Sequence, residues 1–212
     1  VTPTGVIEAI KLFVSDGTTA GTKLLANTLV GPRNLTAVGN VLFLSGSSPG
    51  SLNGNQLLKT DGGPVTIVKD FQFANETLND LPSNFINVNG VLHFSAKNNA
   101  VSGRQIWKSS GSLATTTQQT NTQFGFKVTE IEQVNGTVFF SGVQATPVQN
   151  STGDKLFRLN SLNNVTEFAT AGTSDLTALG AKLFFSQGGQ LSAELSSVNT
   201  AAGGISTLKT FS

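Results

Sequence analysis

The segment "VNGTVFFS" occupies residues 134–141, and three segments of the same design stand elsewhere in the chain. They read "VGNVLFLS" from Val38, "VNGVLHFS" from Val88 and "LGAKLFFS" from Leu179, so successive copies start 50, 46 and 45 residues apart. Before each copy, apolar residues fall at every second position, which is the period of a strand with one buried face. The central pair (Asn-Gly, Gly-Asn or Gly-Ala) favours the positive φ angles of a tight primed turn. Each segment predicts a β-hairpin whose second strand, almost continuously apolar, is covered on both faces.

A second type of segment alternates with the first. It reads "KLFVSDG" from Lys11, "QLLKTDG" from Gln56, "QIWKSSG" from Gln105, "KLFRLNS" from Lys155 and, in a weaker form, "QLSAELS" from Gln190. Another short β-prone run follows each of these segments. The repeating unit is therefore four short strands in about 47 residues, which is typical of one β-propeller blade.

We expect an all-β, β-propeller-like fold, with a β-sandwich or a β-solenoid as the alternatives. The repeats predict a single domain over residues 1–212, with a half blade at 6–30 and blades at about 31–73, 82–120, 128–170 and 173–212. These are about 4.5 blades, a number that fits closure as a five-bladed ring. A half blade leaves an unpaired strand edge, so we expect a further segment or another chain to complete it.

Composition excludes several function classes. The 13 basic and 12 acidic residues nearly cancel, which argues against nucleic acid as a partner. The chain has no cysteine, and therefore no disulfide, thiol nucleophile or cysteine-bound metal. No apolar run is long enough to cross a membrane, and residues 1–10 lack the pattern of a signal peptide, so export would require a signal that is removed or outside this chain. Asn-x-Ser/Thr sequons, relevant to a eukaryotic secretory protein, begin at Asn34, Asn75, Asn135, Asn150 and Asn164, and in a chain this rich in Asn, Ser and Thr chance is the expected explanation.

Few titratable residues suggest chemistry, and we predict no catalytic residue, no metal site and no cofactor. His93 stands where other copies have phenylalanine, so we expect a buried core histidine. Glu130 and Glu132 alternate along one strand, but nothing places a second carboxyl group opposite them, as glycoside hydrolysis requires. An exposed strand edge is the expected role of these two glutamates.

Two further sets of polar residues recur at fixed repeat positions. Asp16, Asp61, Ser110 and Asn160 share one position, where an Asx-type turn explains the tolerated residue types better than calcium binding does. A cation occupies another shared position in the copies at Lys59, Lys108 and Arg158. These cations are expected to face solvent on outer strands, and the alternative is an arc that binds phosphate or an acidic glycan.

The connections of variable length are the expected place for binding. They join the second and third strands (residues 46–55, 97–104, 142–154 and 187–189) or link repeats, with the longest link at 70–83. In a four-stranded meander both kinds leave the same end of the sheet. The candidate ligand-binding or partner-binding aromatic residues are Phe71, Phe73, Trp107, Phe124 and Phe126, and packing beneath a long loop is the alternative for each.

The repeats resemble those of bacterial secreted proteins built from units of the form ELWxSDGTxAGT and NLTxVNGTLYFSA. The stretches that carry this resemblance are "KLFVSDGTTAGTKLL", "NLTAVGNVLFLSG", "QLLKTDGGPVTIVKDF" and "VNGVLHFSA". "QIWKSSGSLATTT" and "KLFRLNSLNNVT" depart from the pattern because they have lost the second Gly-Thr. The resemblance implies an extracellular or cell-surface location and a propeller-like repeat, and it implies no chemistry.

The function that we predict is a non-enzymatic extracellular module, structural or adhesive, that binds a protein partner or assembles with itself within a larger surface assembly. A lectin-like propeller that binds glycans is the first alternative. A hydrolase or lyase whose site another chain completes is the second, and it rests on analogy of fold alone.

Overall fold

The structure is a computed structural model, and it describes residues 11–26, 29–48, 55–71, 81–97, 103–120, 125–144, 153–160, 164–169, 172–189, 192–199 and 204–211. The chain is all-β, with strands joined by turns. Within the described ranges, no helix is long and apolar enough to cross a membrane. The predicted fold class is therefore confirmed at the level of secondary structure.

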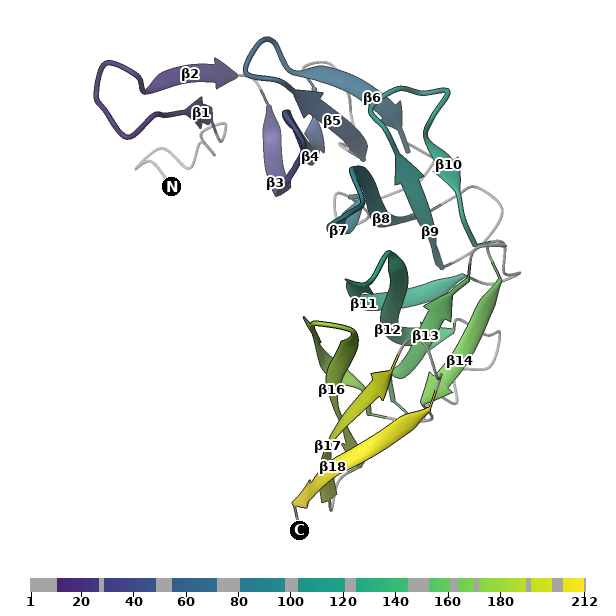
Figure 1. Ribbon diagram of the computed structural model, residues 1–212. Helices are drawn as coiled ribbons and strands as arrows, with labels where there is room; N and C mark the ends of the chain where they lie inside the picture. The colour runs from purple at the N-terminus through teal and green to yellow at the C-terminus, as the bar shows by residue number, and fades with distance from the viewer. Residues whose placement is uncertain are drawn as a thin grey trace, which may run out of the picture. The chain divides into compact units, whose positions relative to one another are not determined.

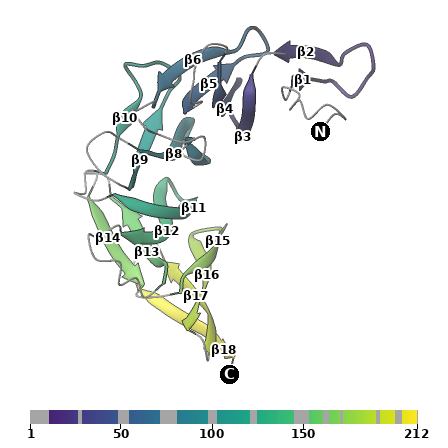
Figure 2. The same cartoon turned by 180° about the vertical axis from the view of Figure 1, so that it is seen from behind.

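The strands form antiparallel sheets in which neighbours in sequence are neighbours in space (Figure 1). The first is a two-stranded pair, β1 (Leu12–Val14) and β2 (Lys23–Ala26). A four-stranded sheet follows, made of β3 (Val30–Val38), β4 (Val41–Ser47), β5 (Gln56–Thr60) and β6 (Thr66–Asp70). The C-terminal four-stranded sheet, which Figure 2 shows from behind, consists of β15 (Ser174–Leu179), β16 (Lys182–Gly189), β17 (Ser192–Asn199) and β18 (Ile205–Phe211).

The middle of the chain holds two further repeats. The first consists of β7 (Ser83–Val88), β8 (Val91–Lys97), β9 (Arg104–Ser109) and the short β10 (Thr117–Gln118). The second consists of β11 (Phe126–Val134), β12 (Thr137–Gln144), β13 (Lys155–Leu159) and β14 (Val165–Ala169). One residue pair, Phe126 with Arg104, joins β11 to β9, and this pair merges the two repeats into one eight-stranded sheet. Strand β3 begins at Val30 and β11 at Phe126, shortly before the predicted blade starts at 31 and 128.

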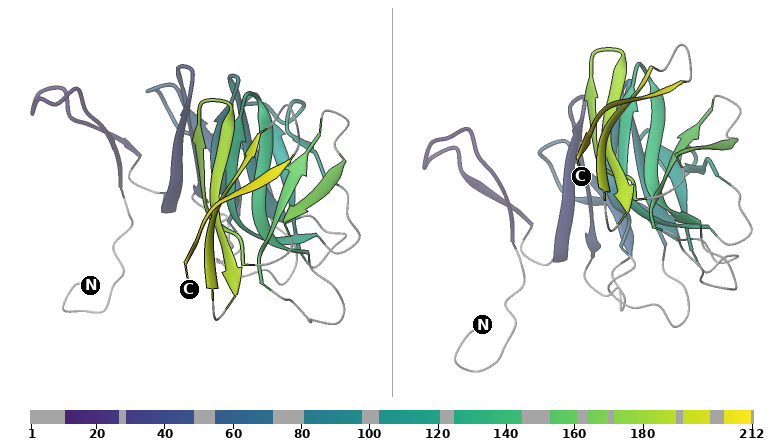
Figure 3. Two further views of the ribbon diagram at one scale, coloured as in Figure 1. Left: turned by 60° about the horizontal axis from the view of Figure 1, so that its bottom comes forward. Right: turned by 90° about the horizontal axis from the view of Figure 1, so that it is seen from below.

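The chain divides into two compact units. The first comprises residues 1–92 and 108–117, and the second comprises residues 93–107 and 118–212. In the first unit β3 lies against β7, and in the second β11 lies against β15, so the first strands of successive repeats are neighbours within each unit. Figure 3 shows the strands of the β15–β18 sheet, in green to yellow, next to one another in two views from below.

The predicted hairpin turns are present, and they are of two types. Asn89 and Gly90 both have positive φ angles (51° and 81°), as do Asn135 and Gly136 (51° and 77°), which is the pattern of a type I′ turn. In the Gly-Asn and Gly-Ala copies only the glycine is positive, at 58° for Gly39 and 60° for Gly180. A glycine in the first central position defines a type II′ turn, so the residue order selects the turn type.

A buried hydrophobic cluster in the C-terminal half of the chain lies between two repeats. Leu156, Phe139 and Val134 of the β11–β14 repeat form one buried cluster with side chains of the β15–β18 sheet, which are Leu183, Phe185 and Val198. On its other face the β11–β14 repeat buries an aromatic group. The rings of Phe140 and Phe157 stack at 5.1 Å, and Phe126 meets both edge-on at 5.0 and 5.1 Å. Both faces of this repeat are therefore packed.

The first unit uses the same scheme. Leu12 of β1 is buried against Leu44 and Leu58 of the β3–β6 sheet, with Leu25 and Ala26 of β2 packed beside them. The two-stranded pair therefore covers one face of the first complete sheet. This is the contact that successive blades of a propeller make.

The second strand of each repeat was predicted to be covered on both faces. This prediction is confirmed in three repeats and wrong in the last one. Both faces of β4, β8 and β12 are buried through the middle of the strand, as the continuous apolar pattern predicts. In β16, Leu183 and Phe185 are buried, but the alternate residues Phe184 and Ser186 are only half-buried. One face of the β15–β18 sheet therefore has no neighbouring sheet within the described residues.

Candidate functional site

A bulge near the start of the first strand places a polar side chain at the same point of several repeats. This residue stands four positions before the residue that opens each hairpin segment (Val38, Val88, Val134 or Leu179), and it is Asn34, Asn84, Glu130 or Asp175. Asn34, Asn84 and Asp175 have positive φ angles of 54°, 56° and 58°, and the strand register shifts there in β3, β11 and β15. A bulge re-aims the side chain that it carries, so this residue is not constrained to the alternation of its strand.

Two of these side chains bind the following repeat. The Asn34 amide donates to the Ser45 hydroxyl of its own sheet at 2.9 Å, and to the carbonyl oxygen of Pro82 just before β7 at 3.0 Å. The Glu130 carboxylate accepts a hydrogen bond from the backbone N–H of Leu176 in β15 at 2.9 Å. The expected role of Glu130 at an exposed strand edge was therefore wrong, because its carboxylate links two sheets. Glu132 instead accepts from the N–H of Gln133, next to it in sequence, at 2.7 Å.

Asp175 has the same place in the last repeat and bonds locally. Its Oδ2 accepts from the hydroxyls of Ser186 at 2.8 Å and Ser174 at 2.9 Å. These bonds favour the charged form, so the Ser186 hydroxyl and then the Ser174 hydroxyl hold the pKa of Asp175 below its ordinary value. The serine partner was visible in the sequence, because every copy of the "VNGTVFFS" segment ends in serine, but alternation alone assigned it no function.

The turn after the third strand contains a second recurring polar device. Asp16 accepts from the N–H of Thr18 at 2.9 Å and Asp61 from the N–H of Gly63 at 3.1 Å, which confirms the predicted Asx-type turn. The side-chain bond from Thr18 is the main reason that the pKa of Asp16 is lowered. The residue before the shared turn position also contributes, which we did not predict. The hydroxyls of Ser15, Thr60 and Ser109 accept from the glycine N–H two positions later, at 3.1, 3.0 and 3.0 Å.

The aromatic candidates within the described ranges are buried. Phe71, Trp107 and Phe126 are 2%, 8% and 1% exposed, and Trp107 donates its ring N–H to the carbonyl oxygen of Ala96 at 3.2 Å. These side chains pack in the core, so a ligand could stack on them only after they were uncovered. Phe73 and Phe124 lie outside the described residues. Most residues of the variable connections also lie outside them, at 49–54, 72–80, 98–102, 121–124, 145–152 and 190–191.

His93 and two of the recurring cations lie within the packing of the repeats. His93 is 9% exposed, as expected for a core histidine. Lys59 is opposite Phe43 in the β4–β5 register and half-buried. Arg158 is opposite Phe139, and its guanidinium carbon is 4.8 Å from the centroid of the Phe168 ring. Solvent-facing cations were therefore the wrong prediction for these two residues, whereas Lys108 is exposed.

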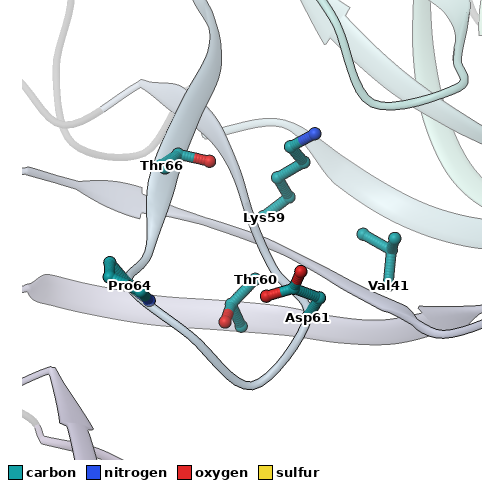
Figure 4. Close-up of a pocket in the computed structure, with 6 residues that line it drawn as sticks. All are labelled: Val41, Lys59, Thr60, Asp61, Pro64 and Thr66. Carbon is teal, nitrogen blue, oxygen red and sulfur yellow. The ribbon is translucent and has the colours of Figure 1, made fainter.

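One hollow carries polar side chains in the first complete sheet. It has a volume of about 420 Å³ and is lined by Val41, Lys59, Thr60, Asp61, Pro64 and Thr66. Figure 4 shows the Lys59 ammonium and the Asp61 carboxylate on this hollow, with Pro64 and Thr66 to their left and Val41 to their right. The hollow holds one cation, Lys59, and one carboxylate, Asp61, that already caps a turn. Among the described residues, no group of three His, Cys, Asp or Glu side chains is placed to bind a metal ion.

Comparison with solved structures identifies the architecture. The dipeptidyl peptidase 4 of Porphyromonas gingivalis matches 94% of this chain with a TM-score of 0.61 and 12% identity. TolB from Acinetobacter baumannii matches 95% with a TM-score of 0.54 and 16% identity. A nidogen/laminin complex contains a chain that matches 90% with a TM-score of 0.51 and 13% identity. The fold is β-propeller-like.

These three matches share a fold with the chain at 12–16% identity. At such low identities the likeness is one of fold alone. The chain spans 29% of the peptidase chain, 49% of the TolB chain and 67% of the chain from the nidogen/laminin complex. No known protein family matches the sequence, and no curated protein does either.

Proposed function

We propose that this chain is a non-enzymatic propeller module with a structural or protein-binding role in an extracellular assembly. The observation that carries the proposal is the hydrogen bond that the Glu130 carboxylate accepts from a neighbouring sheet. It belongs to the pair of carboxylates that came nearest to a catalytic set, and it accepts the N–H of Leu176 from the next repeat at 2.9 Å. A carboxylate committed to backbone between sheets is a structural group.

Other described carboxylates serve similar purposes. Asp16 and Asp61 cap turns, Asp70 accepts from the Gln56 amide at 3.0 Å, and Glu167 pairs with Lys155 at 2.9 Å. Catalytic acids and bases converge on a pocket and have perturbed pKa values there. Here the polar groups hold turns and strands, which supports a scaffold rather than an active site.

A protein ligand agrees better with the exposed surface than a glycan does. Large apolar side chains are exposed next to one another on the β1–β2 pair, where Phe13 is 55% exposed and its cross-strand partner Leu24 is 46% exposed. Adjacent exposed apolar side chains are typical of contacts with proteins. The aromatic side chains on which the lectin alternative depended are buried at Phe71, Trp107 and Phe126. The propeller of the nidogen/laminin complex lies in an assembly of proteins, which supports a protein partner by analogy.

The extracellular location is part of the proposal. It is supported by the resemblance of the repeats to those of secreted bacterial proteins. A test in the native host compares intact and lysed cells for cleavage of this protein by an added protease. We expect equal cleavage before and after lysis, and protection in intact cells would contradict a surface location.

The non-enzymatic role is tested with the purified chain on panels of glycosides, esters and peptides. We expect no turnover above the buffer rate. Turnover that is lost in Glu130→Gln or Asp61→Asn, with unchanged circular dichroism, would assign an active site and refute the proposal.

A further inference from the structure

We propose that the uncovered face of the β15–β18 sheet binds the N-terminal β1–β2 pair of a second copy of this chain, so that copies associate head to tail. The inference rests on the proposed function, because it takes a protein as the ligand.

The first surface, which we call the open face, consists of positions that other repeats bury. Leu179 is 68% exposed, whereas its counterparts Val38, Val88 and Val134 are 7%, 5% and 1% exposed. Leu195 is 39% exposed and pairs with Ser186, whereas Leu57 and Leu156, which pair with the equivalent Ser45 and Ser141, are both at 0%. Phe184 is half-buried where Phe43 and Phe139 are at 2% and 0%.

The neighbouring repeat shows what these positions contact when they are covered. Val134, Phe139 and Leu156, the counterparts of the open-face residues, pack against the next sheet along the chain. The open face continues on β18, where Lys209 is opposite Leu195 and Phe211 is two residues further along the strand. The sequence of the last repeat is therefore apolar at the positions by which its predecessor binds a following blade.

The second surface, which we call the N-terminal face, is its complement. Phe13 follows Leu12 as Leu58 follows Leu57 and Phe157 follows Leu156. Leu58 and Phe157 are 1% and 3% exposed, but Phe13 is 55% exposed, and its cross-strand partner Leu24 is 46% exposed. Since Leu12 is buried against the β3–β6 sheet, Phe13 and Leu24 lie on the opposite face of the β1–β2 pair.

The two surfaces fit each other in the order in which successive repeats pack. The open face is the side of a blade that contacts its successor, and the N-terminal face is the side that contacts its predecessor. A contact between two different surfaces of identical chains is heterologous, and each copy keeps one surface for a further neighbour. A contact of one open face with another would instead be isologous.

Sedimentation velocity on the purified chain tests the proposal with two variants. Leu179→Asp/Leu195→Asp removes the open face, and Phe13→Asp/Leu24→Asp removes the N-terminal face. Leu113→Asp is the matched control, because Leu113 is 64% exposed in the turn between β9 and β10 and belongs to neither face. Circular dichroism confirms that each variant remains folded.

We expect the mean mass of the wild type and of Leu113→Asp to rise with concentration, and each double variant alone to stay monomeric. An equimolar mixture of the two double variants should form a heterodimer and nothing larger, because one intact open face meets one intact N-terminal face. A wild type that is monomeric at every concentration overturns the inference, as closure within one chain would produce. Self-association of the Phe13→Asp/Leu24→Asp variant alone overturns it in favour of an isologous contact. A monomeric wild type without turnover leaves the proposed function standing, whereas turnover refutes that function whatever the mass.

Discussion

Replacing Glu130 by alanine should loosen the contact between the β11–β14 and β15–β18 repeats at one identifiable amide. The carboxylate accepts the Leu176 N–H at 2.9 Å in a partly buried position. Hydrogen bonds to charged groups contribute about 1.5–3 kcal/mol, and we take the lower end because the site is only partly buried. In Glu130→Ala the N–H of Leu176 has lost this acceptor.

The magnitude converts directly into a rate of hydrogen exchange. A loss of about 1.4 kcal/mol is tenfold in an equilibrium constant, so the Leu176 amide should exchange about tenfold faster in the alanine variant. Glu130→Gln keeps an acceptor oxygen without the charge and should accelerate exchange less. The measurement is amide exchange by NMR or mass spectrometry, under conditions in which exchange reports the opening equilibrium.

Glu132→Ala is the control on the same strand. Its carboxylate bonds only to the N–H of Gln133 among the described contacts, at 2.7 Å, so the exchange of Leu176 should be unchanged. Equal exchange of Leu176 in the wild type and Glu130→Ala would refute the reasoning. Equal acceleration in both alanine variants would refute it as well, since the effect would then belong to the strand and not to the bond.

Three more predictions concern the core and the turns. Phe140→Ala should lower the free energy of unfolding by about 3–5 kcal/mol in urea titrations, because the ring is fully buried between two other phenylalanine rings, and a smaller loss than that of an exposed-site variant contradicts this packing. Asn135→Val should cost about 1–2 kcal/mol, seen as a lower Tm, because φ is 51° there, whereas Asn135→Gly should be tolerated. Thr18→Ala should raise the pKa of Asp16 toward its ordinary value of 3.8 in a carboxyl NMR titration, and an unchanged pKa counts against the side-chain bond. Since this pKa is lower in the folded chain, the stabilisation is present above pH 3.8 and is lost as the pH falls through the folded value.

The fold was predictable because its signals are local and repeated. The hairpin turns follow from two residues, such as Asn135 and Gly136, whose conformational preferences hold wherever they stand. Alternation before the turn and continuous apolar character after it then assign the strands and their faces. In the weakest copy, the sequence pattern placed the third strand at residues 190–196. The strand register shows which residue of that strand is equivalent to those in the other repeats: Leu195 pairs with Ser186, the serine that ends the hairpin segment.

The polar contacts were not predictable in the same way. Asn34 and Pro82 are 48 residues apart, and Glu130 and Leu176 are 46 apart, so each bond requires the packing of two repeats. A bulge also turns these side chains away from the direction that alternation assigns to them. The buried state of Trp107 and Phe126 shows the same limit, because nearness to a variable connection in sequence does not determine which way a ring points.

Because the chain is built from repeats, the exposed fraction of a side chain can be compared with that of its counterparts in the other repeats. The inferred assembly depends on this comparison. Leu113 and Leu179 are about equally exposed, at 64% and 68%, and exposure alone does not distinguish them. The counterpart of Leu113 in the first copy is Thr19, a polar and exposed turn residue, whereas the counterparts of Leu179 are valines that their neighbours bury. An exposed leucine among exposed counterparts is ordinary surface. An exposed leucine among buried counterparts has the chemistry of an interface and, within the described residues, lacks the sheet that would cover it, which is why the association test alters Leu179 and keeps Leu113 as its control.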